Sequence, residues 1–149
     1  LIGAFFGTPR RNREEAESEE KAHALLQMFG VDQFADQWVP NLPYGAQRRV
    51  EMARALAMDP KVLFLDEPTA GMNPEETVAM MALVKKVQES GMTIILVEHD
   101  MGVVMDLSNR VFVLNFGNMI MDGTPEEVQN NPEVIKAYLG EEDLYATRR

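Results

Sequence analysis

Two adjacent carboxylates, Asp66 and Glu67, are the side chains whose type and position best suit chemistry. They follow residues 62–65 (VLFL), a continuous apolar run typical of a strand covered on both faces. Ligands of open α/β sheets bind at the carboxyl ends of the strands, where this pair would lie. We expect Asp66 to be an oxygen ligand for a magnesium ion that bridges nucleotide phosphates, and Glu67 to polarise the attacking water as a general base. The alternative is a solvated acidic pair at a strand end.

Two further features suit the same chemistry. His99 follows a second apolar run, residues 93–97, and its imidazole can donate or accept a hydrogen bond. One strand away from Asp66, it would sense a terminal phosphate and orient the water. A helix that starts near Gly45 would offer unpaired N–H groups and a partial positive charge to a phosphate. The other histidine, His23, is expected at the surface of a charged helix.

The elements that must position these residues alternate between helices and short strands. The first two strands and the helix between them predict a right-handed βαβ unit with a parallel pair, and the last two strands predict a short antiparallel pair. This order indicates an α/β sandwich. The predicted helices span residues 10–29, 45–58, 74–90, 101–107, 125–130 and 132–139, and the predicted strands span residues 62–65, 93–97, 111–114 and 119–121.

Composition narrows the functional classes. The 149 residues include 14 basic and 24 acidic side chains, a formal charge of -10, so we expect no nucleic-acid partner. There is no cysteine, which excludes disulfides and thiolate metal sites. The apolar runs are too short to cross a bilayer. The first residue is not methionine, from which we expect that the chain begins inside a longer reading frame.

Four motifs in series resemble those of ATP-binding-cassette (ABC) ATPases. They are the signature motif at residues 42–49 (LPYGAQRR), Walker B at Asp66 and Glu67, the D-loop at residues 70–74 (AGMNP) and the switch histidine at residues 97–100 (VEHD). The resemblance implies the C-terminal part of a P-loop NTPase, that is, of a RecA-like parallel-sheet sandwich, over residues 45–140. Residues 1–44 would be part of the family's helical subdomain, ending at the signature motif, and residues 141–149 a mobile tail.

The resemblance also implies roles for these positions. Glu67 and His99 would be catalytic, Asp66 would bind Mg²⁺, and Asn73 would belong to the D-loop. The signature residues would contact the ATP of the opposite subunit in a head-to-tail dimer; they are Tyr44, Gly45, Ala46 and Gln47. This signature departs from the family's commonest Leu-Ser-Gly-Gly-Gln, so that phosphate contact must rest on the backbone from Tyr44 or Gly45 onward. Asn73 replaces the usual aspartate, which puts in doubt any carboxylate-like role there.

Other family motifs are missing from these residues. No segment matches G-x-x-x-x-G-K-[ST], the phosphate loop (Walker A) that supplies the amide cradle, the lysine and the Mg²⁺-binding hydroxyl. The Q-loop and the adenine-stacking aromatic are missing too. We therefore expect this polypeptide alone to bind ATP weakly or not at all, and to be marginally stable because its parallel strands lack their neighbours.

Residues 41–45, 98–101 and 130–140 look like the ATP-binding subunit of bacterial branched-chain amino acid importers. That resemblance implies an ATP-hydrolysing subunit, here without Walker A, at the cytoplasmic face of the inner membrane. Its partners would be a second ATPase subunit, identical or not, two membrane permeases and, indirectly, a periplasmic substrate-binding protein. Three alternatives remain: the ATPase of lipopolysaccharide export, a non-catalytic module that docks on a permease or full-length partner, and a metal-dependent hydrolase that would need further ligands.

Overall fold

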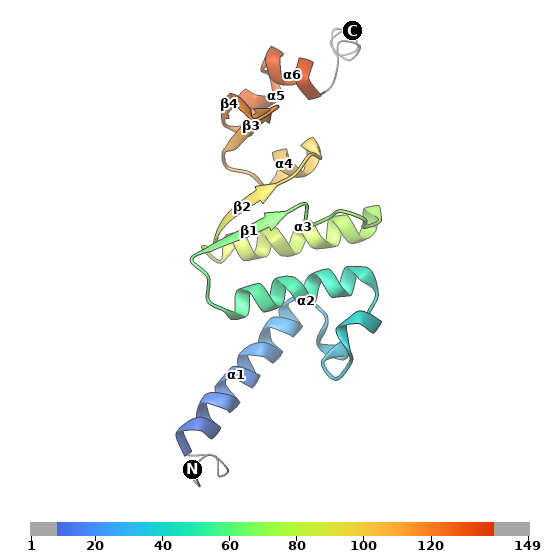
Figure 1. Ribbon diagram of the computed structural model, residues 1–149, viewed down its shortest axis with the longest axis vertical. Coiled ribbons are helices and arrows are strands. Elements are labelled where there is room, and N and C mark those ends of the chain that lie inside the picture. Colours follow the sequence, from blue (N-terminus) through green and yellow to red (C-terminus); the bar gives the residue numbers. More distant parts are fainter. Residues whose placement is uncertain (1–8, 139–149) are drawn as a thin grey trace. The chain divides into compact units, whose positions relative to one another are not determined.

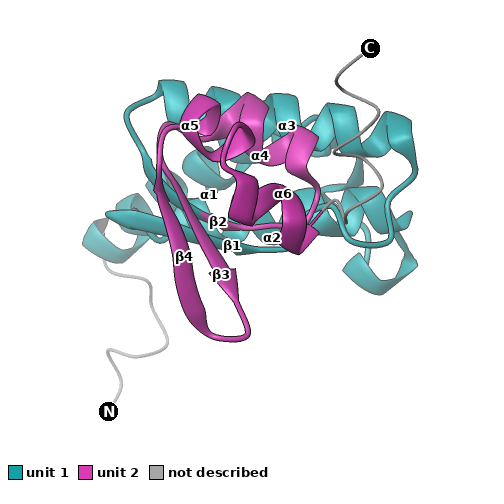
Figure 2. Ribbon diagram, turned by 90° about the horizontal axis from the view of Figure 1, so that it is seen from above, with its two compact units in different colours: residues 1–95 teal, residues 96–149 magenta. Residues whose placement is uncertain are grey.

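The computed structural model describes residues 9–138, and Figure 1 shows their course. The chain divides into two compact units, residues 1–95 and 96–149, which Figure 2 colours separately. None of the helices described between residues 9 and 138 combines the length and the apolar character that a bilayer crossing requires.

All the predicted helices and strands are present, most with ends within one or two residues of the expected positions. Two short 3-10 helices were not predicted. The division at residue 44 stays a prediction, and the predicted tail at 141–149 lies outside the described residues. The elements in order are α1 (Pro9–Met28), η2 (Asp32–Phe34), η3 (Val39–Asn41), α2 (Tyr44–Ala57), β1 (Val62–Asp66), α3 (Pro74–Glu89), β2 (Thr93–Val97), α4 (Met101–Leu107), β3 (Val111–Asn115), β4 (Asn118–Gly123), α5 (Pro125–Gln129) and α6 (Pro132–Tyr138).

The predicted β–α–β arrangement spans residues 62–97, of which all but the last two residues of β2 belong to the first unit. Strands β1 and β2 are neighbours in one sheet, α3 connects them in the chain, and their arrows run the same way in Figure 1. Helix α3 buries Met80, Val84 and Val87, whose spacing places them on one stripe of the helix. The core of this unit, with relative exposures of 8% or less, also includes Phe29, Val31, Leu42, Met52, Ala53, Leu63 and Leu65.

Strand β1 is covered on one face, and the expectation of two covered faces was wrong for the described residues. Leu63 and Leu65 are buried, but Val62 and Phe64 are 47% and 62% exposed. Because successive strand residues point to opposite faces, these two pairs define an inner and an outer side. A continuous apolar run indicates that both faces of a strand are suited to burial. It does not indicate whether other described residues pack against both of them.

The second unit is built on the β3–β4 hairpin, which confirms the predicted antiparallel pair. Val111 pairs with Gly123 and Asn115 with Asn118, with a register shift after Val113. Its core is formed by Val111, Val113, Val128 and Val134. At the open end of the hairpin, Arg110 donates two hydrogen bonds to Asp122, of 2.7 and 2.8 Å, and this guanidinium holds the pKa of the Asp122 carboxyl below its ordinary value.

The tip of this hairpin offers a test of local backbone strain. Phe116 and Gly117 both have positive φ angles, +46° and +80°, as a type I′ turn requires, and the Phe116 residue is 99% exposed. Because asparagine tolerates this conformation better than phenylalanine, we expect Phe116→Asn to raise the free energy of unfolding by about 0.5–1 kcal/mol. The measurement is the urea midpoint at unchanged m value. Phe112→Asn, in the strand itself, should lower the midpoint, and a loss for Phe116→Asn would contradict the turn assignment.

Candidate functional site

Asp66 and Glu67 lie where the sequence predicted, at the carboxyl end of a strand in a parallel pair. Asp66 is the last residue of β1, and both residues are exposed. Glu67 has a φ of +43°, a left-handed conformation that few non-glycine residues adopt. Its carbonyl oxygen accepts a hydrogen bond of 3.0 Å from the Ala70 amide. A turn over residues 67–70 therefore begins at the second carboxylate.

Asn73 caps the start of α3, a structural role that the sequence analysis did not predict. Its side chain accepts a hydrogen bond from the Glu76 amide (2.9 Å), and its own amide donates to the Glu76 carboxylate (3.1 Å). This reciprocal capping box begins α3. The spacing of an asparagine and a glutamate three residues apart before an apolar helix was the signal that could have found it. A nucleotide contact by Asn73 stays a prediction.

The predicted phosphate contact lies at the start of α2, which begins at Tyr44. Pro43 is its N-cap and gives no side-chain hydrogen bond, while its carbonyl accepts the amides of Ala46 (2.9 Å) and Gln47 (3.0 Å). Within residues 9–138, the amides of Tyr44 and Gly45 have no acceptor. The sequence predicted phosphate contact by the backbone from Tyr44 or Gly45 onward, and helix N-termini attract anions.

Gly45 and Gln47 already have close neighbours in this structure. Gly45 is buried, and a Cβ atom added to it would lie 2.8 Å from Oε1 of Glu76. The side-chain amide of Gln47 donates to the Leu42 carbonyl at 2.8 Å, toward the preceding loop. The absence of a side chain at Gly45 therefore makes room for the Glu76 carboxylate in this structure. Phosphate contact by Gly45, Ala46 and Gln47 stays a prediction.

Arg48 is a residue of this region that the sequence reasoning missed. Its Nε atom donates to the Tyr44 hydroxyl at 3.0 Å, and its guanidinium lies 5.2 Å from the centre of the Tyr44 ring. It also donates to Glu51 (3.0 Å), and the hydrogen bonds to Glu51 and Tyr44 raise the pKa of Arg48. The four-residue separation of Tyr44 and Arg48 on one helix was the available signal.

A hollow of about 190 Å³ adjoins the first carboxylate. Residues of α2, β1 and α3 line it, among them Arg48, Met52, Leu65, Asp66 and Met80. The described residues contain no group of three or more His, Cys, Asp or Glu side chains able to hold a metal by themselves. An exposed single carboxylate does fit Mg²⁺, because this ion commonly takes one or two carboxylates together with substrate phosphates and waters.

His99 lies in the second unit. The imidazole is 75% exposed, whereas the side chain of the preceding Glu98 is 1% exposed. The Glu98 carboxylate accepts the His99 amide at 3.2 Å and lies 3.9 Å from Nδ1 of the ring. Asp100 then caps α4 by accepting the amides of Gly102 (2.8 Å) and Val103 (3.2 Å). The meeting of His99 with the carboxylates of the first unit stays a prediction.

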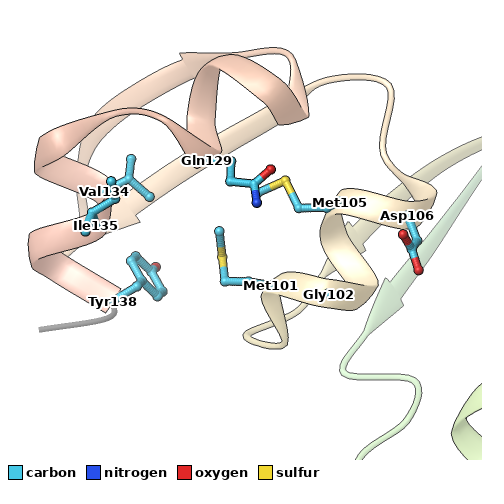
Figure 3. A pocket seen from close by; sticks show the side chains of 8 residues that line it. All are labelled: Met101, Gly102, Met105, Asp106, Gln129, Val134, Ile135 and Tyr138. Atoms are coloured by element: carbon cyan, nitrogen blue, oxygen red, sulfur yellow. The ribbon is translucent and has the colours of Figure 1, made fainter. Parts of the chain in front are cut away.

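A second cavity, of about 220 Å³, lies beside α4 in the same unit. Figure 3 shows Met101 and Met105 of α4 on one side and Ile135 and Tyr138 of α6 on the other, with the Asp106 carboxylate turned away. Its lining is mostly apolar. This cavity adds no group to the residues that the sequence singled out, which are Asp66, Glu67 and the start of α2 in the first unit and, separately, His99 in the second.

The chain is similar in sequence and in fold to several known proteins. Residues 5–70 match a family model described as ABC transporter, and residues 118–143 match one described as branched-chain amino acid ATP-binding cassette transporter. The high-affinity branched-chain amino acid transport ATP-binding protein BraF of Pseudomonas aeruginosa is 45% identical over 142 residues, covering 95% of the chain. The chain belongs to the ABC transporter ATPase family.

Two other members of the ABC family extend the comparison. The lipopolysaccharide export system ATP-binding protein LptB of Haemophilus influenzae is 33% identical over 133 residues, covering 89% of the chain and 55% of that protein. A solved structure, the ADP conformation of MJ1267, an ATP-binding cassette of an ABC transporter, has a TM-score of 0.75 at 29% identity and covers 84% of the chain and 51% of its own. The chain spans about half the length of the relatives it matches, with 56% of BraF covered. The predicted P-loop NTPase fold is confirmed.

Proposed function

We propose that this chain provides the hydrolytic half of an ATP site in an ABC importer for branched-chain amino acids. One observation supports this above the others: two exposed carboxylates, the second with a left-handed backbone, end a parallel strand in a unit that also presents a helix N-terminus with free amides. In the proposal, Glu67 polarises the attacking water and His99 orients it. The amides of Tyr44 and Gly45 bind phosphate of the ATP held by the opposite subunit.

Magnesium and ATP are the proposed cofactors. Asp66 would hold Mg²⁺, which, when bound, neutralises charge on the β- and γ-phosphate oxygens. The phosphate loop is not among these 149 residues, so the proposed site needs one from outside them. We propose accordingly that the chain alone does not turn over ATP.

The choice of an importer for branched-chain amino acids rests on the second family match. Residues 118–143 match the model described as branched-chain amino acid ATP-binding cassette transporter, and identity to BraF is 45% against 33% to LptB. A role in lipopolysaccharide export is therefore the weaker candidate. The proposed partners are a second ATPase subunit, membrane permeases and, through them, a periplasmic substrate-binding protein. The proposed location is the cytoplasmic face of the inner membrane.

A non-catalytic module is the second candidate function. The observation that favours it is the lack of a phosphate loop within residues 1–149. Such a module would dock on a permease or on a full-length ATPase and leave Glu67 unused. The two candidates differ in whether the carboxylates act on ATP once a phosphate loop is supplied.

The test supplies that loop. We would join the chain to the part of the Pseudomonas aeruginosa relative that lies outside the matched residues and measure phosphate release from Mg²⁺–ATP by the chimaera and by the chain alone. We expect magnesium-dependent hydrolysis by the chimaera only. A folded chimaera that binds ATP without hydrolysing it would contradict the proposed hydrolytic function and favour the non-catalytic docking module. Tight magnesium-dependent binding by the chain alone, measured by calorimetry, would contradict the need for an outside loop.

A further inference from the structure

The loop between Glu67 and α3 is tied to the start of the signature helix by one side chain. The Tyr44 hydroxyl donates a hydrogen bond of 3.0 Å to the Ala70 carbonyl, 26 residues further along the chain. The Tyr44 ring lies beside Gly71, where an added Cβ atom would be 3.5 Å from the ring. Gly71 has a φ of +77°, so the loop turns at the point where the ring meets it. The Tyr44 side chain therefore meets this loop at two successive residues, Ala70 and Gly71.

The other end of the same loop segment is Glu67. The Ala70 amide donates to the Glu67 carbonyl (3.0 Å), and the Met72 amide donates to the Thr69 carbonyl (3.0 Å). The peptide groups that flank Ala70 thus connect Tyr44 on one side with Glu67 on the other. A left-handed non-glycine residue such as Glu67 persists only where its surroundings enforce it.

Arg48 orients the phenol that makes this connection. Its Nε atom donates to the Tyr44 oxygen, which leaves the hydroxyl hydrogen free to point at Ala70. The guanidinium also lies over the ring, a cation–π contact that favours this position of the ring. Glu51 accepts from the same guanidinium at 3.0 Å and keeps it in place.

We propose that Tyr44 is a positioning residue: with Arg48 behind it, it holds the loop after Glu67 so that the Glu67 backbone stays left-handed and its carboxylate stays at the end of β1. We call Tyr44, Arg48 and Ala70 the tether. The tether deepens the proposed function, on which its catalytic consequence rests. It links the helix start that would contact one nucleotide to the carboxylate that would act on another.

Tyr44→Phe tests the tether because it removes only the hydroxyl. In the 149-residue chain we expect the amides of Ala70 and Met72 to exchange with solvent about five- to tenfold faster, the effect of losing one net hydrogen bond. The Cα and Cβ chemical shifts of Glu67, which report its backbone conformation, should move away from left-handed values. Arg48→Gln should move the same signals in the same direction by a smaller amount.

Tyr138→Phe is the matched control. Tyr138 is 45% exposed, close to the 43% of Tyr44, and its hydroxyl likewise donates to a main-chain carbonyl, that of Leu114, at 2.8 Å. It lies in the other unit, so its loss should leave the Glu67 shifts and the exchange of Ala70 unchanged. Unchanged Glu67 shifts in Tyr44→Phe would overturn the proposal, even if that variant were less stable.

A kinetic measurement separates this inference from the proposed function. In the chimaera we expect Tyr44→Phe to lower kcat for ATP about tenfold at a KM within about twofold, and Tyr138→Phe to change neither. A chimaera without any hydrolysis would count against the proposed function, while the shifts of Glu67 would still decide the tether. A fall in kcat without any change in the Glu67 chemical shifts would contradict the positioning role of Tyr44 and leave the proposed hydrolytic function standing.

Discussion

Glu67→Gln is expected to lower the kcat of the chimaera for ATP about 10²- to 10⁴-fold, the range that a positioned general base contributes. Glutamine has the size of glutamate and keeps the hydrogen-bonding shape of the side chain, but it cannot accept the proton of the attacking water. Glu67 is an exposed residue that directly follows β1, so solvent water reaches this position. The measurement is steady-state phosphate release at saturating Mg²⁺–ATP.

The control for this variant is Glu19→Gln. Glu19 is an exposed residue of α1, and its neutralisation changes the net charge by the same amount. We expect its kcat to stay within about twofold of the parent, since a distant exposed charge is largely screened. ATP binding by Glu67→Gln should persist, because the general base contributes to the transition state more than to substrate binding. Equal losses in both variants, or full activity of Glu67→Gln, would remove Glu67 from the mechanism.

Local signals in the sequence were enough for the elements that carry the candidate site. The apolar run before Asp66, the Asn73-Pro74 start of α3 and Gly91 near its end predicted β1, α3 and β2 almost to the residue. The turn at residues 115–118 predicted the hairpin in the same way. These signals act through backbone conformation within a few residues, so the tertiary structure has little opportunity to override them.

The contacts that organise the site could not be predicted in this way. Tyr44 meets Ala70 and Gly45 meets Glu76 across 26 and 31 residues of chain, and such pairs depend on how α2 and α3 pack. The exposure of Phe64 could not be predicted for the same reason, because an apolar strand residue does not determine which residues will pack against it. The relation of His99 to Glu67 depends on two separate units and stays a prediction.

Met80→Ala is expected to lower the free energy of unfolding by about 2–5 kcal/mol. Met80 is fully buried in α3 and lines the hollow beside Asp66, so its truncation removes apolar contacts and leaves a cavity under the end of β1. Met80→Leu conserves volume and should cost less than about 1.5 kcal/mol.

The matched control for the buried methionine is Met58→Ala, at the end of α2, where the residue is 82% exposed. We expect its effect to stay within about 0.5 kcal/mol, as for most surface substitutions. Urea midpoints at constant m value compare the three variants. Because α3 begins at the Asn73 cap that follows the loop of Glu67, Met80→Ala should also speed amide exchange at Ala70, and Met58→Ala should not. Equal destabilisation by the two alanine variants would show that α3 does not form the core on which the carboxylates depend.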